Sequence, residues 1–279
     1  RLADVWQKYV TNIPLIYVLS TPRKSTERAQ QLFLEEVREM RHRLEKWAGV
    51  EITDAALRQA ISLFNHFRQL LRELYEMKKG DRPPITGAET LEVINAAFRM
   101  PKDEYVALLE RLLEEINATG RVVKAPLRLM ITGSPLNNPE FIKVIESQGA
   151  LVVVDELCMG TRYWWGSVEE TKYPDPLEAI SRRYLSNFPC ARMVPCDDRF
   201  DKVLGLARDY RVDGVVSQII RYCVPYAHDQ PLLRERLEAT GVPVLELDTE
   251  YGMAGTGQIM TRAQAFLEML QAKKIVVRR

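Results

Sequence analysis

The chain has 279 residues, with 39 Lys and Arg against 38 Asp and Glu, and a formal net charge of +1. This length suits one large domain or two of ordinary size. The balanced charge argues against a surface dedicated to nucleic acid, which normally carries a basic excess. No uncharged apolar run of about 18 residues occurs, so the sequence predicts no membrane span. We expect a globular, cytoplasmic protein.

Residues 1–24 contain a helical segment around residues 5–9 and an apolar run at 15–19 that predicts one buried strand. A strand so near the beginning needs neighbours, which suggests a parallel sheet whose earlier strands are missing. The first residue is Arg rather than Met, and the opening residues form neither a signal peptide nor a normal start. We therefore expect residues 1–24 to be the remnant of a first α/β lobe, in a fragment or a shortened chain.

Residues 25–124 are predicted to be entirely helical. Helices are expected to start at Ser25, at Thr53 and at Thr86 or Thr90, with a last one over 102–117. The charge runs in this region are typical of solvated helix faces. No chemically suggestive cluster occurs here.

Residues 125–279 alternate between short apolar runs and helical segments, which predicts a parallel sheet covered by helices on both faces. Five strands are expected, at 127–131, 150–154, 191–194, 214–217 and 242–247. The helices between and after them are expected at 139–148, 177–185, 200–210, 230–240 and 261–272. The fold class is therefore α/β, with this domain following the helical region.

Ligands of such domains bind at the carboxyl ends of the strands. Three of the four cysteines, Cys158, Cys196 and Cys223, follow predicted strands, whereas Cys190 enters one. They are either reduced structural thiols or soft ligands for a metal or an iron–sulfur cluster. Ser134, in a strand-to-helix turn that could hold an anion, is a candidate catalytic residue.

The segment from Asp155 to Trp165 brings two carboxylates, a thiol, an arginine and three aromatic rings together after one strand. We take Glu156 as the second candidate catalytic residue. Tyr163, Trp164 and Trp165 are candidates for the wall of an aromatic pocket that would suit a small acyl group. The alternative is that the paired Trp residues cover an interface.

Several segments together resemble the 2-hydroxyacyl-CoA dehydratase and benzoyl-CoA reductase family, also called the 2-hydroxyglutaryl-CoA dehydratase D-component family. They are DELCMGTR at 155–162, RRYL at 182–185, PC at 189–190, VDGV at 212–215, YCVP at 222–225, LELDTEYG at 245–252, GQ at 257–258 and TRAQAFLE at 261–268. The resemblance covers most of residues 127–270. It implies two flavodoxin-like lobes around a helical region, so the C-terminal domain is expected to be flavodoxin-like.

The resemblance also implies a [4Fe-4S] cluster held by three cysteines, two from the first lobe and one from the last. Cys223 matches the last of these ligands, and the other two would lie upstream of Arg1. This stretch alone therefore lacks a full ligand set, unless Cys158 or Cys196 substitutes. We therefore expect either that the natural protein is longer or that this chain is an inactive remnant.

The activity that the resemblance implies is elimination of water from a 2-hydroxyacyl-CoA through a ketyl radical, after activation by one electron. The implied partners are a homologous second subunit or a second copy, an ATP-dependent iron–sulfur activator and the acyl-CoA substrate, in an oxygen-sensitive, anaerobic system. Three alternatives remain: a benzoyl-CoA reductase-type subunit, a double-cubane cluster reductase, and a structural partner subunit without a cluster.

Overall fold

The computed structural model describes residues 2–124, 126–250 and 256–277. The chain forms two compact units. The first, here called the helical unit, contains Arg1–Asn65, Gly166–Asn187 and Met193–Pro195. The second, the α/β unit, contains His66–Trp165, Phe188–Arg192 and Cys196–Arg279. The domain ranges 1–24, 25–124 and 125–279 stay predictions.

The helical unit is built from amphipathic helices that bury one face each. Its helices are α1 (Leu2–Tyr9), α2 (Glu27–Ala48), the first part of α3 (Asp54–Glu76) and α8 (Pro176–Leu185). Helix α2 is well delimited, since the Thr26 hydroxyl accepts from the amide of Ala29 and Gly49 ends it in the left-handed conformation. Phe33 of α2 and Leu177 of α8 belong to one buried apolar cluster.

The strand predicted at 15–19 is wrong. Residues 15–20 have no regular secondary structure, and Leu19 packs against the apolar cluster of α2 and α8. A strand is stabilised by hydrogen bonds to a second strand, and the described residues of the helical unit include none. The expected first-lobe remnant thus lacks the strand on which it was based.

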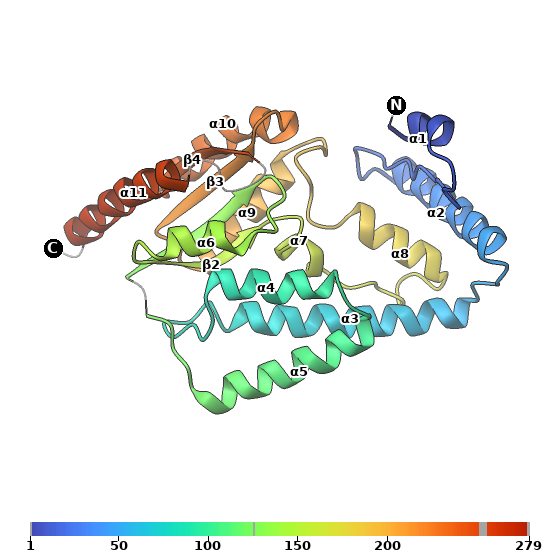
Figure 1. Cartoon of the computed structure of the whole chain (residues 1–279), viewed down its shortest axis with the longest axis horizontal. Coiled ribbons are helices and arrows are strands. Elements are labelled where there is room, and N and C mark those ends of the chain that lie inside the picture. The colour runs from blue at the N-terminus through green and yellow to red at the C-terminus, as the bar shows by residue number, and fades with distance from the viewer. Residues whose placement is uncertain (1, 125, 251–255, 278–279) are drawn as a thin grey trace. The chain divides into compact units, whose positions relative to one another are not determined.

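The α/β unit contains a four-stranded parallel sheet, which confirms the predicted α/β fold. The strands are β1 (Leu127–Gly133), β2 (Ala150–Glu156), β3 (Gly214–Ile220) and β4 (Val244–Thr249), in the order β2-β1-β3-β4. This order is the beginning of the flavodoxin-like 2-1-3-4-5 arrangement. All the carboxyl ends of the strands lie at one edge of the sheet (Figure 1).

Helices cover both faces of this sheet. Leu127, Leu129 and Ile131 share one face with a core cluster drawn from α4 (Gly87–Ala97), α6 (Pro139–Glu146) and α11 (Thr256–Val277). On the other face, α10 (Val224–Ala239) lies beside α9 (Asp197–Asp209). Gln230 of α10 donates a hydrogen bond to the hydroxyl of Ser217 in β3. The remaining helices of this unit are the later part of α3, α5 (Lys102–Thr119) and the short α7 (Thr161–Trp164).

The strand predicted at 191–194 is also wrong, so the described sheet has four strands rather than five. Residues 191–194 form a turn, and the amide of Val194 donates to the carbonyl of Arg23 at 2.9 Å. The amide of Val194 therefore makes its hydrogen bond to a residue that is not in a strand.

No described helix combines the length and the apolar character needed to cross a membrane.

Candidate functional site

The carboxyl ends of β1 and β2 meet in register, so the polar side chains that end these strands are neighbours. Thr132 of β1 lies opposite Glu156 of β2 and Ser217 of β3. The Thr132 hydroxyl donates to Glu156 Oε2 at 2.6 Å. These residues define the candidate site.

Asp155 shapes the turn that follows β2. Its carboxylate accepts hydrogen bonds from the Tyr75 hydroxyl, from the amide of Leu157 at 3.1 Å and from the amide of Thr161 at 2.8 Å. Gly160 passes so close that a Cβ atom there would lie 1.8 Å from Asp155 Oδ1. The turn therefore depends on both residues, and it carries Cys158 at its middle.

Glu156 is fully buried within ion pairs. Arg199 donates to it from Nε at 3.2 Å and from Nη2 at 2.9 Å, and Arg162 forms a second ion pair with it. Burial alone would raise the pKa of Glu156, but Arg162 and Arg199 outweigh this effect and lower it. The carboxylate is thus ionised and held by two cations, and its predicted catalytic role stays a prediction.

Arg199 links three elements through one guanidinium group. Besides Glu156 of β2 it pairs with Asp229 of α10, while its own backbone lies in the first turn of α9. Its side chain is 1% exposed. Two arginines and two carboxylates, Arg162, Arg199, Glu156 and Asp229, therefore form a buried network of balanced formal charge at the strand ends.

Ser134 is fixed to β3 rather than open to a ligand. Its hydroxyl accepts from the amide of Ile220 at 3.0 Å, and its amide donates to the carbonyl of Gln218 at 2.9 Å. Gly133 precedes it at φ +122°, where a Cβ atom would lie 1.8 Å from that same carbonyl oxygen. The catalytic role expected of Ser134 stays a prediction, and its observed contacts are structural.

The three candidate pocket aromatics contact side chains of the protein itself. Tyr163 stacks on Phe98 with ring centroids 4.3 Å apart, and Trp164, 2% exposed, lies 5.0 Å from the ring of Tyr75. Trp165 is half-buried and meets the edge of another ring, Phe188, at 5.4 Å. A substrate contact stays a prediction for all three.

The candidate cysteines follow different elements and do not assemble into one ligand set. Cys158 is half-buried, and Arg162 Nη1 lies 3.6 Å from its sulfur. Cys223 is half-buried at the N-terminus of α10, directly after Tyr222, which has φ +70° and is 90% exposed. No group of three His, Cys, Asp or Glu side chains that could hold a metal ion occurs among the described residues.

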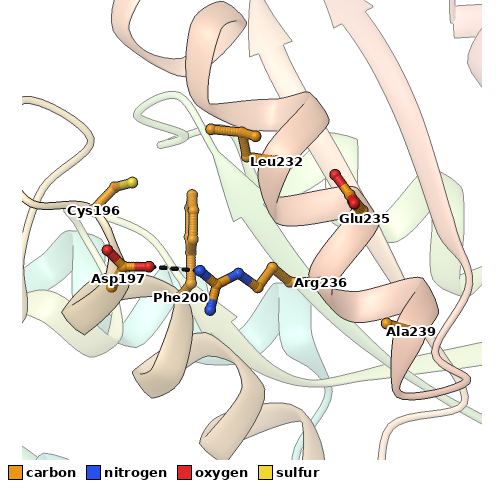
Figure 2. Close-up of a pocket in the computed structure, with 7 residues that line it drawn as sticks. All are labelled: Cys196, Asp197, Phe200, Leu232, Glu235, Arg236 and Ala239. Atoms are coloured by element: carbon orange, nitrogen blue, oxygen red, sulfur yellow. Dashed lines mark hydrogen bonds and ion pairs between the residues drawn. The ribbon is translucent and has the colours of Figure 1, made fainter.

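Cys196, the third candidate, lies at one end of a shallow cavity between α9 and α10 (Figure 2). The cavity has a volume of about 450 Å³, and an ion pair between Asp197 and Arg236, 2.5 Å long, crosses it. Glu235 also lines the cavity, and the apolar part of its lining comes from both helices, namely Phe200, Leu232 and Ala239. Cys196 is thus placed on this surface.

Sequence reasoning missed four residues of the site: Arg199, Asp229 and Tyr75, which take part in its ion pairs and hydrogen bonds, and Tyr226, whose ring centre lies 5.3 Å from the guanidinium carbon of Arg199. Arg199 directly precedes the buried Phe200 and lies four residues before the buried Val203. An arginine at such a position on a helix is a signal of a buried ion pair. The other three follow only from the three-dimensional structure.

Comparison with known proteins agrees with the family resemblance found in the sequence. The family model described as 2-hydroxyglutaryl-CoA dehydratase, D-component, matches residues 1–270. The (R)-phenyllactyl-CoA dehydratase beta subunit of Clostridium sporogenes is 23% identical, over 94% of this chain and 69% of its own length. The lactoyl-CoA dehydratase subunit beta of Anaerotignum propionicum is 25% identical, over 95% and 71%. A benzoyl-CoA reductase subunit of Thauera aromatica is 24% identical, over 85% and 62%.

Proposed function

Because the chain belongs to the 2-hydroxyglutaryl-CoA dehydratase D-component family, we propose that it is a subunit of an enzyme that removes water from a 2-hydroxyacyl-CoA. The observation that carries this proposal is the match over residues 1–270, which includes most of the α/β unit and its strand-end site. Two relatives named as dehydratase subunits support it over most of the chain.

The proposal assigns Cys223 as one ligand of an iron–sulfur cluster. Thiolate sulfur is the usual ligand of such clusters. Cys223 is half-buried and follows the carboxyl end of β3, the edge at which α/β sheets bind ligands. Tyr222, with its left-handed backbone, makes the sharp turn that brings the cysteine to the start of α10.

The described residues do not complete a site for this cluster, since no suitable group of three side chains occurs among them. Cys158 lies beside Arg162, and Cys196 lies in the cavity between α9 and α10. We propose that the further ligands come from outside the described residues. The assignment of a [4Fe-4S] cluster, like the ketyl-radical route, stays a proposal for the whole enzyme.

A benzoyl-CoA reductase-type activity is the second candidate. The similarity to a benzoyl-CoA reductase subunit over 85% of the chain favours it. Both candidates share acyl-CoA as the substrate class, and they differ in whether a hydroxyl group leaves or an aromatic ring is reduced. A flat aromatic slot would suit the reductase.

The same comparisons support a partner subunit. Several relatives are named as subunits, and we propose that this chain pairs with a homologous subunit or a second copy and takes electrons from an ATP-dependent iron–sulfur activator. We propose a cytoplasmic location.

The function is tested by product analysis. The natural protein, purified anaerobically with its co-purifying subunit, is mixed with activator, ATP, reductant and 2-hydroxyglutaryl-, lactoyl-, phenyllactyl- or benzoyl-CoA. Mass spectrometry of the products is expected to show loss of water from at least one hydroxyacyl-CoA. Reduction of benzoyl-CoA with no dehydration would favour the second candidate, and no product from any of the four would contradict both.

A further inference from the structure

A buried hydroxyl group at the candidate site has no hydrogen-bond partner. Tyr226 lies in the first turn of α10, three residues after Cys223, and its side chain is 6% exposed. Its hydroxyl oxygen is buried and unpaired among the residues that the structure describes. Buried hydroxyl groups are nearly always hydrogen-bonded, because an unpaired one costs free energy of folding. An unpaired buried hydroxyl beside the strand-end site is therefore a candidate contact for a bound ligand.

The surroundings of Tyr226 are strongly polar. The guanidinium carbons of Arg199 and Arg162 lie 5.3 and 5.7 Å from the centre of its ring. Glu156 and Cys158 also act on its hydroxyl electrostatically. Tyr226 thus lies beside the buried ion-pair network, and its hydroxyl is close enough to the half-buried thiol that follows β2 to interact with it electrostatically.

The hydroxyl is suited to donate a hydrogen bond. Burial raises the pKa of Tyr226 well above its usual range, so the phenol keeps its proton at neutral pH. Among the charged groups, Glu156 acts on this hydroxyl more strongly than Arg162 or Arg199, so the two guanidinium groups do not give it a net positive field. A neutral oxygen with a free lone pair, such as a carbonyl or a hydroxyl oxygen, is the acceptor that fits this donor.

We propose that Tyr226 is a substrate-binding residue whose hydroxyl donates a hydrogen bond to an acyl-CoA oxygen, the thioester carbonyl or the 2-hydroxyl. This inference rests on the proposed function, because acyl-CoA is the ligand class that the family implies. The site lies at the carboxyl edge of the sheet, on the helix that begins next to Cys223. Substrate binding thereby satisfies a donor that the free protein leaves unpaired.

Tyr210 provides a matched comparison within the same unit. It is 1% exposed, and its hydroxyl is also unpaired among the described residues. Its backbone, however, lies at the opposite edge of the sheet, where Arg128 at the start of β1 donates to the Tyr210 carbonyl at 2.9 Å. A buried tyrosine is thus available whose backbone lies at the other end of the strands, although its hydroxyl acts electrostatically on Asp155.

The test compares Tyr226→Phe with Tyr210→Phe in the natural protein, purified anaerobically with its partner. Calorimetry measures the Kd of 2-hydroxyglutaryl-, lactoyl- and phenyllactyl-CoA and of the same three acyl-CoAs without the 2-hydroxyl. We expect Tyr226→Phe to weaken binding about 10-fold, as loss of one buried hydrogen bond does. We expect Tyr210→Phe to leave Kd unchanged. Neither variant should lower Tm, since neither hydroxyl has a partner to lose among the described residues.

Each outcome decides one point. Weaker binding of both members of a pair supports the carbonyl oxygen as acceptor, and weaker binding of the hydroxylated member alone supports the 2-hydroxyl. Binding by Tyr226→Phe equal to wild type, an equal loss in Tyr210→Phe, or a Tm lowered by several degrees in Tyr226→Phe overturns the inference while leaving the proposed function standing. If the wild-type protein binds none of the acyl-CoAs, the proposed function fails and the inference fails with it.

Discussion

Arg199 donates to the carboxylate of Glu156 from two nitrogens, at 3.2 and 2.9 Å, with both side chains almost completely buried. The same guanidinium group also pairs with Asp229. It therefore connects the end of β2 to α9 and to α10, the helix that begins next to Cys223. Arg199 thus ties the helix that follows the proposed ligand to the end of β2.

Replacing Arg199 with Met should destabilise the protein by about 3–5 kcal/mol. The reason is that Glu156 and Asp229 would lose a partner while Glu156 stays buried. Urea unfolding measures the change. Arg234→Met is the control, because the pair of Arg234 with Glu246 is exposed and should cost at most about 1 kcal/mol. Equal small losses in the two variants would show that the buried network does not stabilise the fold.

Lys78 should make stability depend on pH in the alkaline range. It is 1% exposed and donates to the Thr90 hydroxyl at 2.8 Å, and burial lowers its pKa from 10.5 to about 8. Between these values the unfolded chain holds a proton that the folded chain has lost, so stability rises with pH, by up to about 3 kcal/mol.

Replacing Lys78 with Met should remove this rise. Unfolding of wild type and variant in guanidinium chloride at pH values between 8 and 10.5 measures how the free energy of unfolding changes with pH. The contributions of titratable groups that both proteins share cancel in this comparison. Thr90 keeps a hydrogen bond to the carbonyl of Thr86 at 2.7 Å, so the variant leaves no unpaired hydroxyl there. Parallel pH profiles for the two proteins would refute the assignment.

Gly160 should be far less tolerant of a side chain than Gly205. An alanine Cβ at Gly160 would lie 1.8 Å from Asp155 Oδ1, so the turn that carries Cys158 has to distort. A Cβ at Gly205, within α9, meets nothing within 4 Å and should stabilise the helix by about 0.5–1 kcal/mol. Thermal unfolding of Gly160→Ala and Gly205→Ala checks this. A higher Tm for both would mean that the contact with Asp155 is not restrictive.

The sequence predicts those parts of the fold that depend on local patterns. Strands β1 and β3 and helix α9 follow from apolar runs and apolar periodicity, so the amino-acid pattern alone predicts a parallel sheet with helices. The apolar runs at 15–19 and 191–194 have the same local character, yet neither forms a strand. Periodicity carries no information about whether a second strand is present to pair.

The candidate site is predictable only in outline. The strand-end rule correctly places Ser134 and Glu156 at the carboxyl edge. It does not reveal that the amide of Ile220 donates a hydrogen bond to the Ser134 hydroxyl or that Arg199 donates to Glu156. These contacts join residues 43 or more positions apart. Likewise, only the three-dimensional arrangement shows that the hydroxyl of Tyr226 has no partner among the described residues.

The central claim, an iron–sulfur acyl-CoA dehydratase subunit with Cys223 as a cluster ligand, is tested most directly by iron and acid-labile sulfide per chain after anaerobic purification. We expect the natural protein to contain both and Cys223→Ser to lose most of them. Cys196→Ser, which changes a cysteine beside the cavity between α9 and α10, should retain them. A natural protein without iron would contradict the account, and unchanged iron in Cys223→Ser would contradict the ligand assignment.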